Sequence, residues 1–542
     1  MTRTLLVAAG ILPVDGTQEV PRALLLNGDR ITWRGGVDGE RPGSDRVVDL
    51  GSAWITPAFV DAHVHATATG LALGGVVLTG AGSAAECLDR VRRHAVRTRP
   101  GEVVVGTGWD DFNWRDAPSL TAASVTEATG GRTALLIRVD GHSCAVDEGT
   151  LAGLELSELS GVDRDETGAP TGVLREAASE AAMIVARSTL PQSQLAAARE
   201  ATCARAAALG IGSIHEMGHP GLSGLDDARA WAVGEWPIEV LTWWAEMDPQ
   251  PGTGLRPGGD LFLDGSIGTG TAATGQPYRY GAGETRGDLF HPPAAVADFF
   301  VGCTRAGVGA GVHAIGDRAI EQAVTALEAA AAVVGIEAVR ACRHRIEHAE
   351  LPTRAQVRRM SRLGAVASVQ PAFDATWGGS EGLYAARFSS KAARNSNPFA
   401  WFAQEGVHLA FGSDSPVTPL DPWGAVVAAE RHLGGLGLPR RAALAAHTVG
   451  GRYAAGQDDV GPLCPGFRAD LAVWSGDPLA VEDPRTLRCL ATVVSGRLSR
   501  RDGQQIAPAG PPSGSGARTN GSARRALLVP RRLPEEAARY DP

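Results

Sequence analysis

Two histidines separated by one residue, His63 and His65, end an apolar stretch near the start of the chain (56–65, Thr-Pro-Ala-Phe-Val-Asp-Ala-His-Val-His). In a β-strand, residues two apart point to the same face and lie roughly 6.5 Å apart. Two imidazoles placed in this way can converge on one metal ion. A single pair of this kind is weak evidence, because such histidines also serve as ordinary structural residues.

Three later segments also carry metal-binding or acid–base side chains at the end of a short apolar run. They are Val312-His313-Ala-Ile-Gly-Asp317, Arg345-Ile-Glu-His348 and Ala410-Phe-Gly-Ser-Asp414. Taken alone, His313 and His348 are more often hydrogen-bonded structural histidines, and Asp414 could cap a helix or lie in a turn. Four such segments in this order predict a metal site.

These residue types fit hydrolytic chemistry. A divalent metal held by neutral imidazoles and a carboxylate keeps a position open for water and lowers the pKa of that water to about 7. An aspartate beside the water can take its proton and return it to a leaving amine. We expect Asp414 to carry the proton and His313 to be the second catalytic residue, helping to polarise the substrate carbonyl.

The elements that must position these side chains follow an alternating pattern. Between residues 55 and 455, apolar strand-like segments alternate with alanine-rich helical segments, which is typical of a parallel α/β fold. In a (β/α)8 TIM barrel the C-terminal ends of all strands form one face, so His63 and Asp414 can meet there. The interval 66–200 is too long for one βα unit, and it predicts an insertion in this hydrolase domain.

The two ends of the chain have a different sequence pattern from the middle. Residues 1–54 and 456–505 contain short β-like segments separated by turn residues, and they predict one composite β-sandwich domain built from both ends. Residues 506–542 are rich in Pro, Gly, Ser and Arg, which predicts a mostly disordered tail.

Composition restricts the partners and the compartment. Hydrophobic residues make up 44% of the 542-residue chain and charged residues 20%, as in soluble globular proteins. The net charge of −9 argues against a nucleic-acid or anionic-membrane partner, and the N-terminus predicts a β-strand and not a signal peptide. Seven scattered cysteines without a CxxC motif suit reduced thiols. We expect a cytoplasmic protein with a small-molecule substrate and, by default, a homodimer.

The motifs resemble those of the metal-dependent amidohydrolase superfamily and its amidohydrolase-3 branch, which includes the N-substituted formamide deformylases. Besides residues 56–65, the resemblance is carried by Val312-His-Ala-Ile-Gly-Asp-Arg-Ala-Ile, Arg345-Ile-Glu-His-Ala-Glu, Gly412-Ser-Asp-Ser-Pro-Val and the Gly466-Phe-Arg-Ala-Asp-Leu segment. It covers about residues 1–500. It implies a TIM barrel with a composite β-sandwich and a hydrolase of non-peptide carbon–nitrogen bonds. It also implies a set of metal ligands, namely His63, His65, His313, His348 and Asp414.

One departure from the family concerns lysine. Relatives with two metals commonly bridge them with a carboxylated lysine on a barrel strand, whereas Lys391 is the single lysine of this chain and lies in another context. Asp260 stands where relatives often carry that lysine, so we expect no carbamate bridge. Glu176 or Asp260 could bridge two metals, or one metal could suffice. Our hypothesis is one firmly held ion, with zinc expected ahead of manganese or iron and a second ion left open.

Three further residues are candidates for substrate binding. His142 and His215 each follow an apolar strand-like segment, although an ordinary loop histidine is an equal alternative for His142. Trp109 could form an apolar wall, although core packing is the default for a tryptophan. A deaminase or cyclic-amide hydrolase on the same scaffold remains an alternative function. A catalytically silent binding protein is the other alternative, and the intact set of polar residues argues against it.

Overall fold

The computed structural model describes residues 2–37, 41–111, 114, 120–139, 141, 143–157, 159–221, 223–248 and 253–499. The predicted tail at 506–542 lies outside the described residues. No helix within them is both long and apolar enough to cross a membrane. All seven cysteines are described, and all are free thiols.

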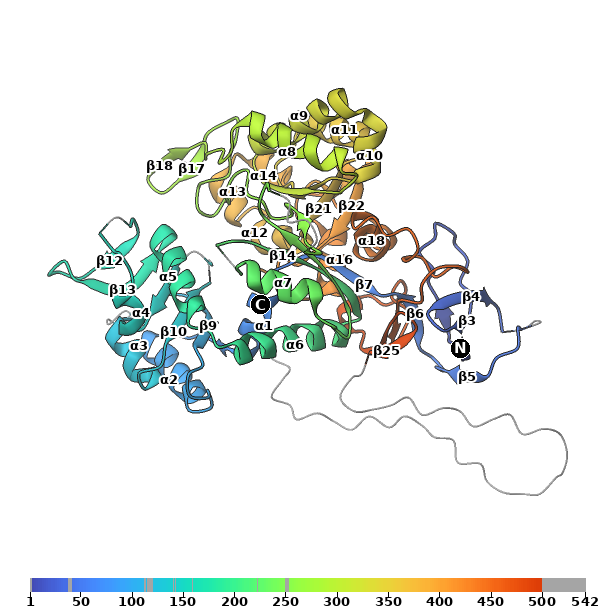
Figure 1. Cartoon of the computed structure of the whole chain (residues 1–542), viewed down its shortest axis with the longest axis horizontal. Coiled ribbons are helices and arrows are strands. Elements are labelled where there is room, and N and C mark those ends of the chain that lie inside the picture. Colours follow the sequence, from blue (N-terminus) through green and yellow to red (C-terminus); the bar gives the residue numbers. More distant parts are fainter. Residues whose placement is uncertain are drawn as a thin grey trace, which may run out of the picture.

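Two parallel four-stranded sheets form the centre of the molecule (Figure 1). The first has the order β16 (Arg256–Pro257), β15 (Glu239–Trp244), β14 (Ile211–Gly218), β7 (Phe59–Val64). The second has the order β19 (Gly311–Ala314), β20 (Arg345–His348), β21 (Val366–Val369), β22 (His408–Phe411). Strands β7, β14, β19, β20 and β21 are buried along their whole length. This is the burial expected of parallel strands that are covered on both faces.

The two parallel sheets meet along two seams. At one seam, the amide of His313 donates to the carbonyl of Leu261 at 2.9 Å, and the amide of Leu263 donates to the carbonyl of His313 at 3.0 Å. At the other, the amide of Asp414 donates to the carbonyl of His63 at 2.7 Å. These bonds lie outside the regular ladders, so the described strands form a mixed α/β structure without one continuous closed sheet.

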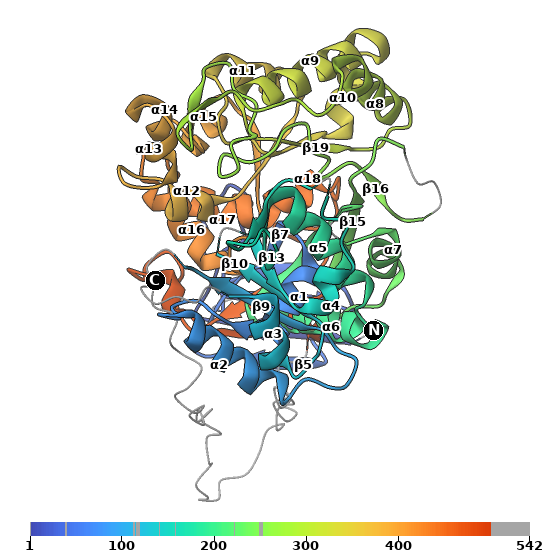
Figure 2. The ribbon, with the colours of Figure 1, turned by 90° about the vertical axis from the view of Figure 1, so that its left-hand side faces the viewer.

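Helices cover the outer faces of the parallel sheets. Figure 2 shows α8 to α11 gathered along one side of the molecule. The helices around the two sheets are α1 (Ala66–Gly74), α6 (Gln192–Ala208), α7 (Leu225–Val233), α8 (Pro293–Arg305), α9 (Asp317–Val334), α10 (Ile336–Cys342), α11 (Arg354–Leu363), α12 (Pro371–Trp377), α15 (Phe399–Gln404), α16 (Pro422–Arg431) and α17 (Arg440–Ala445). Their apolar side chains join those of the strands in the largest hydrophobic core of the protein, where Phe59, Ile214, Val312 and Ile346 are all fully buried.

A separate unit is inserted between β7 and β14. Its six-stranded sheet has the order β12 (Val162–Arg164), β13 (Pro170–Arg175), β11 (Ser143–Val146), β10 (Ala134–Arg138), β9 (Val104–Trp109), β8 (Val76–Val77). Helices α2 (Ala84–Ala95), α3 (Ala122–Thr129), α4 (Glu148–Ala152) and α5 (Glu176–Ser188) accompany the sheet. The unit has hydrophobic cores of its own, and it lies within the interval where the sequence predicts an insertion.

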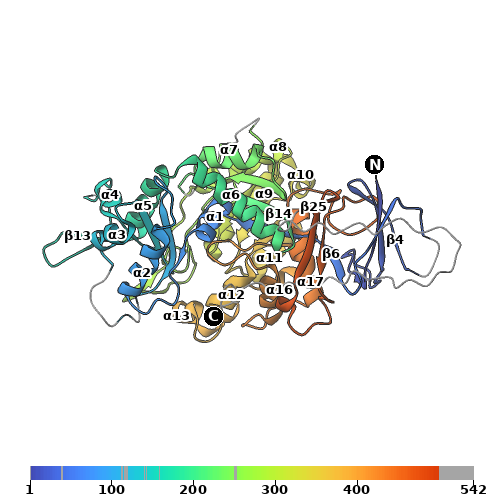
Figure 3. The ribbon, with the colours of Figure 1, turned by 90° about the horizontal axis from the view of Figure 1, so that it is seen from below.

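Both ends of the chain contribute to a β-rich unit. One sheet contains β1 (Arg3–Val7), β3 (Ala23–Asn27), β4 (Arg30–Gly35) and β5 (Arg46–Asp49). The other contains β2 (Gly10–Ile11), β6 (Trp54–Pro57), β23 (Leu471–Trp474), β24 (Cys489–Val494) and β25 (Arg497–Ser499). One hydrophobic core joins the two sheets and includes Leu24, Ile55 and Leu471. Figure 3 shows this unit and the inserted unit at opposite ends of the molecule.

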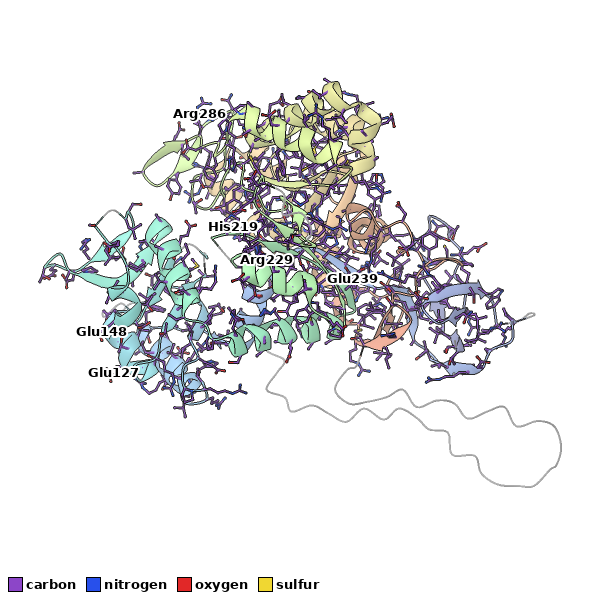
Figure 4. All side chains as sticks on the ribbon, viewed as in Figure 1. Glu127, Glu148, His219, Arg229, Glu239 and Arg286 are labelled. Carbon is purple, nitrogen blue, oxygen red and sulfur yellow. The ribbon has the colours of Figure 1, made fainter. Side chains whose placement is uncertain are left out.

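The central strands run from the β-rich unit toward the inserted unit. In Figure 4, Glu239 at the start of β15 lies toward the β-rich unit, whereas His219, just after β14, lies toward the inserted unit. Because β14 and β15 are parallel, the C-terminal ends of both strands point toward the inserted unit.

Candidate metal centre

The predicted strand-end residues come together at the C-terminal ends of the parallel strands. Two groups of side chains have ligand atoms close enough to hold an ion. One group is His63, His65 and Asp414, and the other is His63, Asp260 and His348. All of these side chains are buried except that of His65, which is partly exposed. His313 lies beside both Asp260 and His348.

The distances in the first group match those around a metal ion. Oδ1 of Asp414 lies 3.4 Å from Nε2 of His63 and 3.3 Å from Nε2 of His65. Two ligand atoms of a tetrahedral zinc ion, each about 2.0–2.1 Å from the metal, lie roughly 3.3 Å apart. Neither Nε2 of His63 nor Oδ1 of Asp414 has a hydrogen-bond partner among the described residues, although both atoms are buried. A buried polar atom without a partner is costly, so the donor set fits a cation at this point.

Asp260 lies between the histidines of the two central sheets. Its Oδ2 is 3.5 Å from Nε2 of His65, and its Oδ1 is 3.8 Å from Nε2 of His63. The same Oδ1 is 3.1 Å from Nδ1 of His313 and 3.3 Å from Nε2 of His348. The carboxylate therefore contacts all four histidines and offers one oxygen toward His65 and the other toward His313 and His348.

The nitrogens that His63, His65 and His348 turn away from the cluster each face an acceptor. Nδ1 of His63 lies 2.9 Å from Glu347, and Nδ1 of His348 lies 2.9 Å from Oε1 of Gln370. The carbonyl of Met217 lies 3.1 Å from Nδ1 of His65. Nε2 of His313 has no hydrogen-bond partner among the described residues, and Asp264 lies 3.7 Å from it. Such outer partners fix the tautomer and the ring orientation of metal-binding histidines.

Both carboxylates of the cluster are held in their charged form. Burial alone would raise the pKa of Asp260, but hydrogen bonds from His313 and His348 hold that pKa well below its usual range. Burial opposes the ionisation of Asp414 too, yet contacts with His63 and His65 lower its pKa. Two buried anionic carboxylates beside four imidazoles form a donor set suited to a divalent cation.

The backbone is strained where it delivers two of these residues. Asp414 has φ of 54°, His348 has φ of 67° and Ala349, which follows it, has φ of 46°. Positive φ is uncommon for residues other than glycine, and it concentrates at functional sites. The strain at these two strand ends supports a functional role for the side chains they carry.

The structure places the other predicted residues elsewhere or leaves them outside the described set. Trp109 is 1% exposed, packs in the core of the inserted unit and donates Nε1–H to the carbonyl of Leu136. This packing does not support a place in a pocket wall. His142 and the side chain of Glu176 lie outside what the structure describes.

His215 is fully buried within β14 of the first central sheet. Its Nδ1 lies 2.9 Å from a guanidinium nitrogen of Arg345, and its ring packs on Trp243. Burial and the nearby guanidinium of Arg345 lower its pKa well below the usual range. The neutral ring supports Arg345, and this position does not favour contact with a substrate.

Several residues near the cluster were not singled out from the sequence. Glu347 lies inside a quoted motif and Asp264 lies four residues after Asp260, but neither carried an assigned role, and each faces one of the histidines. His219 stacks on Phe262, whose ring packs on His313. Burial lowers the pKa of His219 to about 4, so the ring is neutral at pH 7. Its position just after β14, in the same run as His215, was the signal that could have revealed it.

Comparisons with known proteins identify the family of this chain. The model of the amidohydrolase family Amidohydro_3 matches residues 46–499. The Bacillus subtilis (strain 168) protein YtcJ is 25% identical over 494 residues, covering 83% of this chain and 90% of that protein. The N-substituted formamide deformylase of Arthrobacter pascens is 25% identical over 550 residues, covering 92% of this chain and 98% of the relative.

A solved structure shares the fold. A metal-dependent hydrolase of uncharacterised function from Pyrococcus horikoshii OT3 superposes with a TM-score of 0.72 at 24% identity, covering 89% of this chain and 99% of that one. The family match shows that the protein is a hydrolase that acts on carbon–nitrogen bonds. The chain belongs to the amidohydrolase family, in its amidohydrolase-3 branch, and a divalent metal is its expected cofactor.

Proposed function

We propose that this enzyme hydrolyses the carbon–nitrogen bond of an amide or N-substituted formamide at the cluster around Asp260 and Asp414. The observation that carries the proposal is the pair of unpartnered buried atoms, Nε2 of His63 and Oδ1 of Asp414, 3.4 Å apart. The likeness to an N-substituted formamide deformylase supports the choice of substrate class.

The proposed architecture is a (β/α)8 TIM barrel made from the two parallel sheets. The seams at His313 and Asp414 support it, because each supplies hydrogen bonds between the sheets. The segment at 261–263, which follows β16 and hydrogen-bonds to His313 of β19, would then extend β16, so that the eight strands close into a barrel. The common core of the two terminal sheets supports a composite β-sandwich, with domain boundaries at 1–54 plus 456–505 and at 55–455.

The proposed ligands of one firmly held ion are His63, His65 and Asp414, with Asp260 beside them. Asp260, His313 and His348 could hold a second, weaker ion, with Asp260 as the bridge. A bound divalent ion, with zinc expected ahead of manganese or iron, supplies a polarised water and carbonyl at neutral pH. Lys391 lies in the short helix α14 (Ser390–Arg394) and is exposed, so a carbamate bridge is not expected.

In the proposed reaction, Asp414 moves the proton. Its Oδ1 faces His63 and His65, which leaves Oδ2 to accept a proton from the attacking water and return it to the leaving nitrogen. His313, held between Asp260 and Asp264, is proposed to orient the substrate carbonyl as well as to serve as a ligand. The buried carboxylates at the cluster would keep these side chains in place during turnover.

A deaminase or cyclic-amide hydrolase on the same scaffold remains the alternative, because the fold does not fix the substrate. A binding protein without activity is disfavoured by the complete set of His63, His65, His313, His348 and Asp414. A cytoplasmic location and a homodimer stay predictions.

The proposal is tested by following amine release. A panel of N-alkyl and N-aryl formamides, N-acyl amines and cyclic amides would be incubated with protein loaded with Zn²⁺, Mn²⁺ or Fe²⁺. We expect turnover of a formamide or linear amide that chelator abolishes and metal restores. Release of ammonia from amidine-type substrates, with no amide cleaved, would favour the deaminase instead.

A further inference from the structure

A buried arginine lies directly behind His63. Arg345 of β20 is 1% exposed, and its Nε and Nη2 atoms donate to the two oxygens of Glu347 at 2.7 and 3.0 Å. Nη2 also donates to the carbonyl of Ala62 at 2.6 Å and to Oγ of Ser368 at 2.8 Å. The guanidinium therefore holds the carboxylate by both oxygens and in one orientation, as a paired arginine fork does.

The same guanidinium reaches His63 by two routes. Oε2 of Glu347, which accepts from Arg345, lies 2.9 Å from Nδ1 of His63. Because a carboxylate at that distance accepts a hydrogen bond, Nδ1 of His63 carries the hydrogen and Nε2 presents its lone pair to the cluster. The bond to the carbonyl of Ala62 fixes the backbone one residue before His63.

The surroundings of Arg345 leave the guanidinium little freedom. It lies over the ring of Trp243 at 4.6 Å, and its Nη1 is 2.9 Å from Nδ1 of the neutral His215. Glu347 is fully buried. A buried ion pair contributes little to stability compared with apolar packing, so its retention beneath a ligand histidine needs a further reason.

We propose that Arg345 and Glu347 are positioning residues that fix the tautomer and orientation of His63 for metal binding. The proposal rests on the metal site proposed above. Arg345 acts through Glu347 on the ring and through Ala62 on the backbone, and neither charged residue contacts the substrate.

A second buried ion pair provides a matched control. Arg452 and Asp470 are 2% and 3% exposed, and Nη2 of Arg452 donates to Oδ2 of Asp470 at 2.7 Å. Arg452 also pairs with Glu239, and Asp470 also accepts from Arg468 and from the amide of Ser495. Within the described part of the chain, Asp470 contacts no histidine of the cluster. Asp470→Asn thus breaks a pair of the same kind away from His63.

The test measures Zn²⁺ affinity by competition with a chelator, together with the visible spectrum of the Co²⁺-loaded protein. Glu347→Gln should weaken Zn²⁺ binding by about 10- to 100-fold and alter the Co²⁺ bands. Arg345→Lys keeps the charge but loses the fork, and it should weaken binding in the same direction. Asp470→Asn should keep a Zn²⁺ affinity within about twofold of wild type, even if it lowers the melting temperature as much as Glu347→Gln does.

The inference is overturned if Arg345→Lys or a folded Glu347→Gln binds Zn²⁺ like wild type with an unchanged Co²⁺ spectrum. It is also overturned if Asp470→Asn weakens binding equally, because the effect would then be a general loss of stability. A wild-type protein that binds no metal would instead refute the proposed function, and this inference with it. The two failures are distinguishable, because metal binding by the wild-type protein tests the proposed metal site and metal binding by the variants tests this inference. Neither measurement requires a substrate.

Discussion

Oδ1 of Asp260 lies 3.1 Å from Nδ1 of His313, although 53 residues separate the two in the chain. This contact crosses the seam between the two parallel sheets. It brings the carboxylate of Asp260 into the histidine cluster, within reach of His63, His65 and His348 as well. As the proposed bridge, Asp260 would supply the anionic oxygens that a carboxylated lysine is not expected to supply here.

We expect Asp260→Asn to remove the weaker metal position and to lower kcat/KM by about 100-fold. The amide keeps the size of the side chain but loses the charge that its two oxygens share among the histidines. Metal analysis and amine release would measure both effects. Asp288→Asn, at an exposed aspartate in the same stretch of chain, serves as the control and should change neither.

Asp414→Asn should lower kcat by roughly 100- to 10,000-fold, the range for loss of a general acid–base group, with little unfolding. Asparagine tolerates positive φ well, so the backbone at φ of 54° should be preserved. Steady-state kinetics would measure the loss of kcat, and thermal melting would show whether the variant stays folded. Asp421→Asn is the control, because Asp421 caps α16 and asparagine caps helices equally well. Unchanged turnover in Asp414→Asn would refute the assigned role.

Gly412→Ala should destabilise the protein and weaken metal binding together. A Cβ at this glycine would lie 2.5 Å from the amide nitrogen of His63 and 2.6 Å from its Cβ. Overpacking of this kind costs about 1–3 kcal/mol, and here it would displace a ligand. Denaturant unfolding and Zn²⁺ titration would measure the losses. Gly302→Ala in α8 meets nothing within 4 Å and should stabilise the helix slightly, which makes it the matched control.

Stability should fall with acid partly because of His344. Burial lowers the pKa of His344 to about 4, and its two ring nitrogens are engaged by Thr304 and Ala310. The unfolded chain takes up this proton below pH 6.5 whereas the folded protein does not until about pH 4. Stability from this group is therefore complete above pH 6.5 and is lost as the pH falls toward 4.

The expected loss between pH 7.5 and pH 5 is about 2 kcal/mol for this one histidine. His344→Gln removes the titration, so the gap in unfolding free energy between wild type and variant should narrow by that amount at pH 5. Chemical denaturation at the two pH values measures it. An equal difference in unfolding free energy between wild type and variant at both pH values would show that His344 does not contribute to the pH dependence.

Much of the cluster could be predicted because parallel strands deliver their C-terminal residues to one edge. His63, His65, His313, His348 and Asp414 each end or follow a short apolar run, so their meeting follows from strand direction alone. Asp260 was one of two candidate bridges, and the structure brings it to all four histidines.

Trp109 and His215 show what the sequence leaves open. A sequence does not show which face of a strand a side chain takes once the strand is buried on both sides. Trp109 belongs to the inserted sheet and packs inward, and His215 faces Arg345. Glu347 was overlooked because its proposed role depends on its contact with His63, which lies 284 residues away in the chain.

The most direct test of the whole account is metal analysis of wild-type protein purified without chelator, beside His63→Ala. Because His63 belongs to both groups of candidate ligands, we predict one tightly held divalent ion per chain in wild type and none in the variant. Two equally tight ions would contradict the single firm site. A wild-type protein without bound metal, or a folded His63→Ala protein that retains its ion, would contradict the metal centre itself.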